Sequence, residues 1–178
     1  AMIAALGLVP QITLGFGVPI TAQTLGVMLA GAVLGARRGT AAAGLFLLLV
    51  ALGLPLLAGG RGGLGVFASP TAGFARGFPV AAFATGLFVE HVRLRSAGLT
   101  AGLGAVFGGI VVLYLMGASG LAMVTGKPLI EAFRLVAVFV PGDLLKAAIT
   151  GMLVQALVRV RPQTLVWHRA PAGSAPRL

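Results

Sequence analysis

Long apolar stretches, separated by short segments that carry charges or clusters of glycine and proline, recur along the chain to about residue 160. A helix needs about 20 mostly apolar residues to cross the hydrocarbon core of a bilayer. The pattern therefore predicts about six membrane spans. The first is short and carries Pro10, so we expect it to be kinked. The approximate limits of the six spans are 2–14, 21–34, 40–57, 71–89, 97–116 and 141–158.

Two segments between the spans have patterns of their own. A glycine-rich loop, 58–65, joins the third and fourth spans on what we expect to be the outer side of the membrane. Residues 128–140 are predicted to form a short helix that lies on one membrane face, and Pro141 suits the first turn of the sixth helix. The predicted fold is an all-α membrane protein, a bundle of about six transmembrane helices with this outer loop and this surface helix.

Composition supports this assignment. Of 178 residues, 58% are hydrophobic and 9% are charged, and the mean hydropathy is +1.07, which leaves too little polar surface for a water-soluble domain of this size. We expect one transmembrane domain over 1–161 and a disordered cytoplasmic tail over 162–178. The chain has no cysteine, and its two histidines are isolated from any carboxylate cluster, so we expect no metal site.

The basic residues are distributed unevenly. With six spans, two loops and the tail fall on one side of the membrane, which the positive-inside rule makes cytoplasmic, together with both termini. Because these arginines are scattered over separate loops without interleaved aromatic residues, we expect no nucleic-acid partner. The arginines on this side are Arg37, Arg38, Arg93, Arg95, Arg159, Arg161, Arg169 and Arg177.

Asp143 and Lys146 carry opposite charges in the sixth span of a chain with only three acidic residues. At this spacing both side chains project from one helix face, and ionisable groups at membrane depth face a partner, a cavity or a ligand. Asp143 precedes Arg159 by 16 residues, which places it roughly 24 Å from the cytoplasmic boundary, near the outer surface. The pair is therefore either part of a polar ligand site or an internal ion pair that shapes one.

Other polar groups are predicted near the same outer face. Glycines of the 58–65 loop, Gly60 and Gly62 among them, would let backbone approach a ligand around Arg61, although a flexible hairpin explains them equally well. Arg76, two turns into the fourth span, requires an anion, which is Asp143, a lipid phosphate or a ligand carboxylate. Thr21, Gln23 and Thr24 open the second span, where they either bond to neighbouring helices or contact a ligand.

Enzymatic activity is not indicated. The sequence has no Ser-His-Asp or Cys-His set on one membrane side, no paired carboxylates and no His-Glu-x-x-His motif. It also has no Walker motif, so energy for uphill transport would come from a partner or from an ion gradient.

Five motifs, in order, resemble the BioY family, the biotin-specific substrate-capture (S) components of energy-coupling factor (ECF) transporters. They are Val18-Pro19-Ile20-Thr21-Ala22-Gln23-Thr24-Leu25-Gly26-Val27, Leu29 to Gly39, Gly59-Gly60-Arg61-Gly62-Gly63-Leu64-Gly65, Ser69-Pro70-Thr71-Ala72-Gly73-Phe74 with Gly77-Phe78-Pro79, and Pro141-Gly142-Asp143-Leu144-Leu145-Lys146. The resemblance implies a monomeric six-helix substrate-binding domain that takes biotin near the extracellular side of a bacterial or archaeal plasma membrane, with no cofactor. It also implies a transmembrane coupling protein, the T component, and two ABC ATPases as partners, with Ala1 and Ala5 as an Ala-x-x-x-Ala docking pair.

Biotin carries two ureido N–H donors, a ureido carbonyl, an apolar body and a carboxylate, and these groups need an acceptor, a cation and an apolar slot. The resemblance therefore implies that Asp143 accepts a ureido N–H and that Lys146, Arg76 or Arg61 receives the carboxylate. The remaining expected ligand contacts are Gln23, Thr24, Gly60, Gly62, Thr71, Phe74 and Phe78. The alternative functions are a self-sufficient channel or ion-coupled carrier for a small carboxylated solute, and a purely structural membrane subunit.

Overall fold

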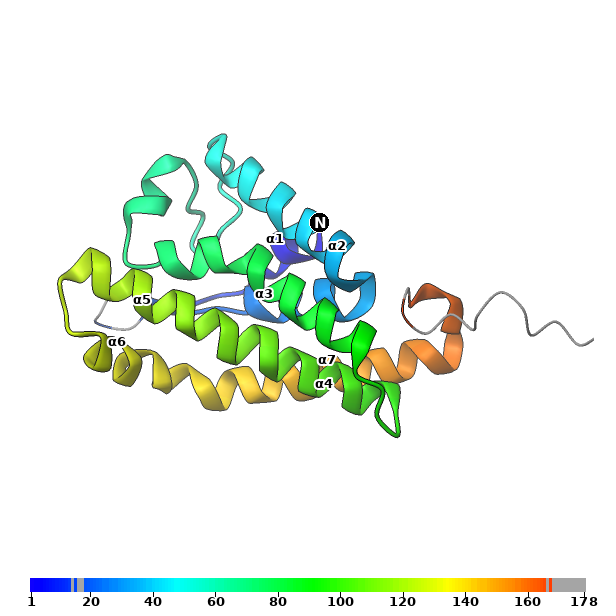
Figure 1. The fold of residues 1–178 in the computed structure, drawn as a ribbon. Helices are drawn as coiled ribbons and strands as arrows, with labels where there is room; N and C mark the ends of the chain where they lie inside the picture. The colour runs from blue at the N-terminus through cyan, green and yellow to red at the C-terminus, as the bar shows by residue number, and fades with distance from the viewer. Residues whose placement is uncertain (14, 16–17, 166, 168–178) are drawn as a thin grey trace, which may run out of the picture.

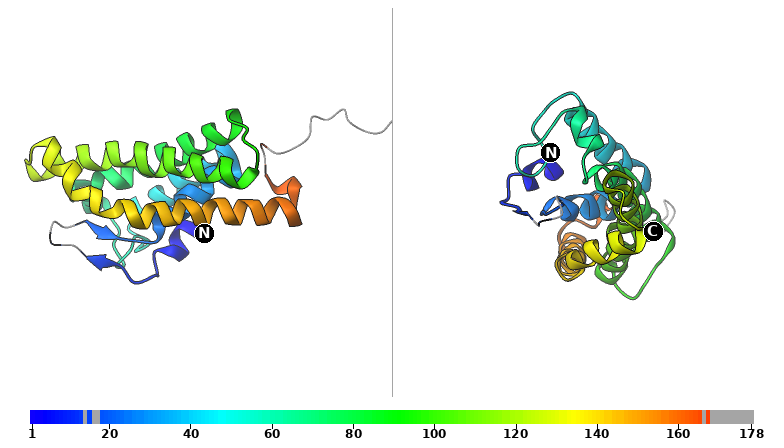
Figure 2. Two further views of the ribbon diagram at one scale, coloured as in Figure 1. Left: turned by 90° about the horizontal axis from the view of Figure 1, so that it is seen from below. Right: turned by 90° about the vertical axis from the view of Figure 1, so that its left-hand side faces the viewer.

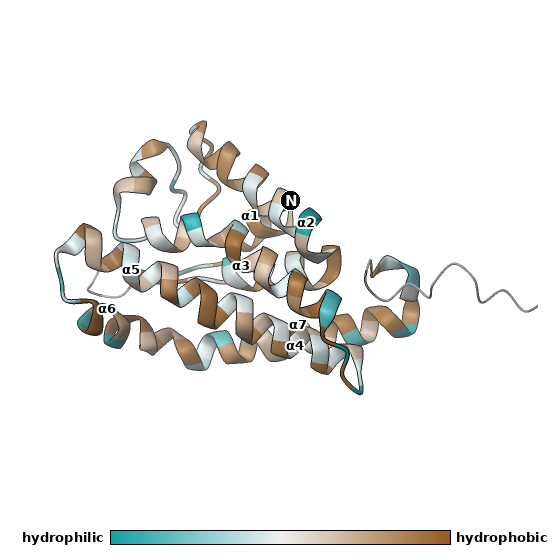
Figure 3. Ribbon diagram, in the orientation of Figure 1, coloured by the Kyte–Doolittle hydropathy of each residue, from teal (hydrophilic) through white to brown (hydrophobic). Residues whose placement is uncertain are grey.

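The computed structural model describes residues 1–13, 15, 18–165 and 167, which form an elongated helical bundle with one short strand pair (Figure 1). Most of the ribbon along the helices is apolar (Figure 3). Within the described residues, four helical stretches are long and apolar enough to cross a membrane, which agrees with the predicted membrane class. They are Gln23–Ala51, Ala72–His91, Ala97–Thr125 and Leu129–Val160.

The first stretch, α2 (Gln23–Ala51), is broken at Gly35, whose φ of 79° and ψ of 179° are far from helical values. A Cβ added to Gly39 would lie 3.0 Å from the Cα of Gly31, whereas eight residues of continuous helix would separate the two by about 12 Å. The two arms of α2 therefore fold back on each other. They correspond to the predicted second and third spans, and the turn lies at Gly35, just ahead of the predicted loop.

Two remote side chains complete the backbone hydrogen bonding at this turn. In an unbroken helix the Ala36 N–H would donate to the Ala32 carbonyl. Here the Ala36 N–H donates to Glu90 Oε1 at 2.8 Å, and the Ala32 carbonyl accepts from Trp167 Nε1 at 2.7 Å. The break thus leaves neither group unsatisfied, which is what burial requires.

The predicted first span differs from the structure. Helix α1 (Met2–Leu6) has five residues, and strand β1 (Ile12–Thr13) then pairs antiparallel with β2 (Pro19–Ile20). Gly7 lies so close to the Leu56 carbonyl that a Cβ would collide with it, and Pro10 cannot donate a helical hydrogen bond. The helix therefore ends before it reaches a membrane-crossing length.

The middle of the chain follows the prediction more closely. A 3₁₀ turn, η1 (Leu64–Ala68), follows the glycine-rich loop and leads into α3 (Ala72–His91). Helices α4 (Ala97–Val106) and α5 (Leu113–Thr125) are joined without interruption by the π-helical segment η2 (Phe107–Val112). This stretch runs nine residues beyond the predicted end at 116, because the first residue that leaves helical conformation is Gly126, with φ of 70°.

A short helix before the sixth span and a helix over the sixth span are both present. They are α6 (Leu129–Val136), followed by a 3₁₀ turn, η3 (Ala137–Phe139), and then α7 (Val140–Val160), with Pro141 in its first turn. In the segment predicted as a disordered tail, η4 (Pro162–Thr164) is followed by Leu165, which is fully buried. Residues 166 and 168–178 of that segment lie outside the described residues.

Helix α3 packs against both arms of α2 and against α5, while α4 packs along α7 (Figure 2). Glycines permit the close contact between α4 and α7, since a Cβ on Gly98 would lie 2.9 Å from the Gly151 carbonyl oxygen. The Gly35 turn, the α3–α4 connection and the end of α7 meet at one end of the bundle. Exposed arginines gather there, namely Arg37, Arg38, Arg93, Arg95, Arg159 and Arg161.

Candidate ligand-binding site

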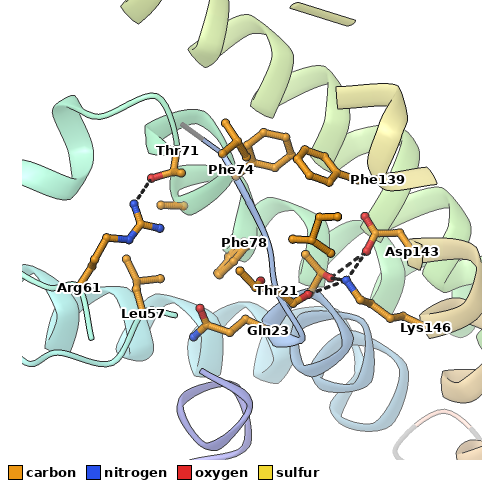
Figure 4. Close-up of a pocket in the computed structure, with 14 residues that line it drawn as sticks. Thr21, Gln23, Leu57, Arg61, Thr71, Phe74, Phe78, Phe139, Asp143 and Lys146 are labelled. Carbon is orange, nitrogen blue, oxygen red and sulfur yellow. Dashed lines mark hydrogen bonds and ion pairs between the residues drawn. The ribbon is translucent and has the colours of Figure 1, made fainter. Parts of the chain in front are cut away.

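A cavity lies toward the opposite end of the bundle, where the strand pair, the glycine-rich loop, α2, α3 and the η3–α7 junction converge (Figure 4). It holds about 590 Å³ of space free of protein atoms, its open mouth included. Half of its lining residues are apolar and half are polar or charged. The lining residues are Val18, Ile20, Thr21, Gln23, Thr24, Leu57, Arg61, Thr71, Phe74, Ala75, Phe78, Phe139, Asp143 and Lys146.

One end of the cavity carries the Asp143–Lys146 ion pair, with 2.7 Å between Lys146 Nζ and Asp143 Oδ1. The carboxylate also accepts hydrogen bonds from the Thr24 hydroxyl at 3.0 Å and from the Tyr114 hydroxyl at 2.6 Å. Asp143 is 3% exposed, so each of these bonds is made in a low-dielectric setting. The sixth-span pair is therefore assembled with groups from α2 and α5.

Local structure explains why the charges can be buried here. Asp143 lies in the first turn of α7, where the helix dipole favours a carboxylate. Lys146 has three N–H donors, and all three have acceptors: Asp143 Oδ1, the Thr21 carbonyl at 2.6 Å and Thr24 Oγ1 at 2.8 Å. The ammonium group is fully satisfied by the protein.

Arg61 occupies the far end of the cavity (Figure 4). Leu57 and Arg61 pair through two backbone hydrogen bonds, which closes the glycine-rich loop and turns the guanidinium inward. Its Nε donates to the Ala58 carbonyl at 3.3 Å and its Nη1 to Thr71 Oγ1 at 3.2 Å, and no described residue accepts from Nη2. Burial lowers the pKa of Arg61, but an arginine starts so high that it stays charged at neutral pH.

Aromatic rings separate the two polar ends. Phe74 and Phe78 come from successive turns of α3, and Phe139 comes from η3. The rings of Phe74 and Phe139 meet edge to face, with centroids 6.2 Å apart, a favoured geometry for aromatic pairs. The cavity is thus an apolar slot with an acceptor at one end and a cation at the other.

Several residues predicted for the site have other positions. Arg76 is exposed and donates to the Phe67 carbonyl at 2.7 Å rather than to Asp143. Gln23 reaches the cavity wall, but its amide donates to the Ile3 and Leu56 carbonyls and accepts from the Ala58 N–H, which ties α1 and the loop to α2. Gly60 and Gly62 are not among the lining residues. Ala1 and Ala5, which are predicted for partner docking and not for the ligand site, are exposed at the start of the chain.

Sequence reasoning missed other residues of the site. Phe139 was assigned to the surface helix, and Leu57 to the end of a span, although both line the cavity. Tyr114 bonds to Asp143 from behind the cavity wall. The available signal was that Tyr114 is the only tyrosine of the chain and lies in an otherwise apolar span, where a hydroxyl needs a buried partner.

Comparison with known proteins agrees with this fold. The chain matches the BioY family over residues 1–163. It is 52% identical over 175 residues to the biotin transporter BioY of Rhodobacter capsulatus, covering 93% of this chain and 92% of the relative. It is also 53% identical over 164 residues to the biotin transporter BioY of Rhizobium etli, covering 89% and 88%. A crystal structure of the S-component for biotin from an ECF-type ABC transporter superposes with a TM-score of 0.84 at 32% identity, covering 94% of this chain and 89% of that one. The chain belongs to the BioY family.

Proposed function

We propose that this chain captures biotin in the membrane, as the S component of an ECF-type importer. The observation that carries the proposal is the division of the cavity, with a buried carboxylate at one end, a charged guanidinium at the other and aromatic walls between them. Biotin has the complementary order of groups: a ureido ring with N–H donors, an apolar thiophane ring and valeryl chain, and a terminal carboxylate. A ligand with only one polar end would leave either the open acceptor position of Asp143 or the Arg61 guanidinium without a ligand partner.

The hydrogen bonding favours one orientation. A carboxylate has about four acceptor positions, and Asp143 receives three donors from the described residues, so one position remains for a ureido N–H. Lys146 has no free N–H, and a ligand carboxylate could reach it only by displacing an existing acceptor. Arg61 keeps Nη2 for a charge-assisted bond. The ureido ring is therefore assigned to Asp143 and the carboxylate to Arg61.

Titration calorimetry on the purified chain in detergent tests this function directly. We expect saturable binding of biotin at one site per chain without any partner protein. Pimelate, which has carboxylates but no ureido ring, should not compete. Absence of biotin binding by a folded sample would refute the proposed function, and binding without partners would exclude a purely structural role.

The proposal extends to topology and partners. With the arms of α2 taken separately, α1, α3, the α4–α5 stretch and α7 make six helices. The end with exposed arginines, which includes the end of α7, would face the cytoplasm, in a bacterial or archaeal plasma membrane. A T component and two ABC ATPases would be the partners, with Ala1 and Ala5 at the docking face. Because the chain has no cysteine, single cysteines at positions 60 and 95 would test orientation: an impermeant thiol reagent added outside should label only position 60.

A further inference from the structure

The π-helical segment η2 changes which face of α5 is turned inward. In a regular α-helix, the buried positions 101, 105 and 108 would be continued near 111 and 115. Val111 and Leu115 are instead exposed, by 47% and 53%. The buried positions after η2 are Leu113, Tyr114, Gly117, Ala118 and Leu121.

The shift follows from the geometry of the π-helix. Hydrogen bonds from i to i+5 place one more residue in a turn than an α-helix does, so the helix beyond it is rotated. Tyr114 follows the exposed Phe107 by seven residues, and an uninterrupted α-helix would place the two within about 20° of each other around the axis, on the exposed face. Glycine makes the segment possible, since side chains at Gly108 and Gly109 would collide with Thr85 and Met28.

The rotation brings Tyr114 to two parts of the candidate site. Its hydroxyl donates to Asp143 Oδ2 at 2.6 Å, the oxygen that neither Lys146 nor Thr24 contacts. Its ring meets Phe74, a wall of the cavity, edge to face at a centroid distance of 6.2 Å. Tyr114 itself is 7% exposed and does not line the cavity.

We propose that Tyr114 is the positioning residue of the site: turned inward by the π-helical segment, it holds the Asp143 carboxylate in the orientation that accepts the ureido ring. This inference rests on the proposed biotin capture and adds a residue that acts through Asp143. Lys146 and Thr24 restrain only Oδ1, and a carboxylate held at one oxygen can still rotate. The Tyr114 bond at Oδ2 removes that freedom before the ligand arrives, which lowers the cost of binding.

Tyr114→Phe keeps the ring and removes the hydroxyl. We expect biotin affinity to fall by about tenfold, the effect of one hydrogen bond to a charged group. In an Asp143→Asn background the same change should cost less than about twofold, whereas in an Arg61→Gln background the tenfold loss should persist, because only residues in contact couple strongly. Ser119→Ala is the matched control, since it removes a hydroxyl of α5 that bonds only within its own helix.

Unchanged or tighter biotin binding by Tyr114→Phe would overturn the inference. An equal loss of biotin affinity in the wild-type and Asp143→Asn backgrounds would also overturn it, because Tyr114 would then act only through its packing. Failure of the unmodified chain to bind biotin would instead refute the proposed function, and the inference with it. Should Tyr114→Phe not fold, the single tyrosine offers a second measurement. Uniform 3-fluorotyrosine labelling places fluorine only at Tyr114, and biotin should shift its ¹⁹F resonance. An unshifted resonance in a sample that binds biotin would overturn the inference.

Discussion

Arg61 gives the sharpest test of how the ligand lies in the cavity. Arg61→Gln removes the charge while leaving an amide that can still donate to the Ala58 carbonyl, as Nε does. A hydrogen bond between charged groups contributes about 1.5–3 kcal/mol, so biotin affinity should fall roughly 10- to 150-fold. The lower part of this range is expected, because Arg61 is only partly buried and solvent screens its charge.

The assay compares biotin with biotinamide by calorimetry. The amide keeps the ring system and loses the negative charge, so wild-type protein should bind it more weakly than biotin, and Arg61→Gln should bind both about equally. Arg76→Gln provides a matched control, since Arg76 is a nearby arginine that bonds to the Phe67 carbonyl outside the cavity. That variant should keep the wild-type preference for the acid.

The assignment of the ligand carboxylate to Arg61 fails if Arg61→Gln weakens binding of biotin and biotinamide by the same factor, because the guanidinium would then act on the loop and not on the ligand charge. It also fails if Arg76→Gln, and not Arg61→Gln, abolishes the preference. Thermal unfolding of each variant in detergent separates loss of affinity from loss of structure.

Three further changes should have distinct effects. Lys146→Met leaves Asp143 buried without its cation and should lower the free energy of unfolding by about 3–5 kcal/mol in a detergent unfolding assay. Glu90→Ala removes the acceptor at the α2 turn and should lower stability by about 1–2 kcal/mol, measured by thermal unfolding, with biotin affinity unchanged. Gly117→Ala introduces a Cβ that overlaps the Phe74 ring and pushes it into the cavity, so biotin affinity measured by calorimetry should fall by about 1 kcal/mol or more.

Each of these changes has a control in the chain. Adding Asp143→Asn to Lys146→Met should recover part of the lost stability, and no recovery would mean that the pair is not the cause. A change in biotin affinity with Glu90→Ala would mean that the α2 turn is coupled to the cavity. Gly65→Ala meets no atom within 4 Å, and an equal effect from Gly65→Ala and Gly117→Ala would contradict the argument from Phe74.

Residues whose position depends on local helix geometry could be predicted from the sequence. Asp143 and Lys146 lie three positions apart in one helix, and their shared face follows from the helical repeat. The assignment to the membrane class could also be made from the sequence. It depends on the total hydrophobic and charged content of the chain and not on which residues touch. Arg61 and Arg76 could not be told apart, since both are arginines near the same predicted membrane face. Whether each reaches the cavity depends on the Leu57–Arg61 backbone pairing, which no local pattern indicates.

The inward position of Tyr114 and the turn in α2 could not be predicted, because both depend on contacts between residues that are distant in sequence. A helical wheel assumes a constant 100° per residue, and one π-helical segment is enough to invalidate it for everything downstream. The Gly35 turn is similar, because its stability depends on Glu90 and Trp167, which are distant in sequence. In both places glycines allow the backbone to depart from the regular helix, and at the α2 turn remote side chains satisfy the backbone groups that the departure exposes.

The two ends of the cavity differ in how many of their hydrogen-bonding groups already have protein partners, and this difference bears on ligand specificity. At the Asp143 end every described donor and acceptor of the ion pair has a protein partner except one carboxylate position. Such a site is rigid and accepts one well-aimed N–H, so a ligand without that donor leaves a buried charge short of a hydrogen bond. At the Arg61 end the guanidinium sits on a loop and keeps an unused N–H, so it can follow a carboxylate on a flexible chain. Discrimination among ring systems is therefore assigned to the Asp143 end, and tolerance of the chain that links ring to carboxylate is assigned to the Arg61 end.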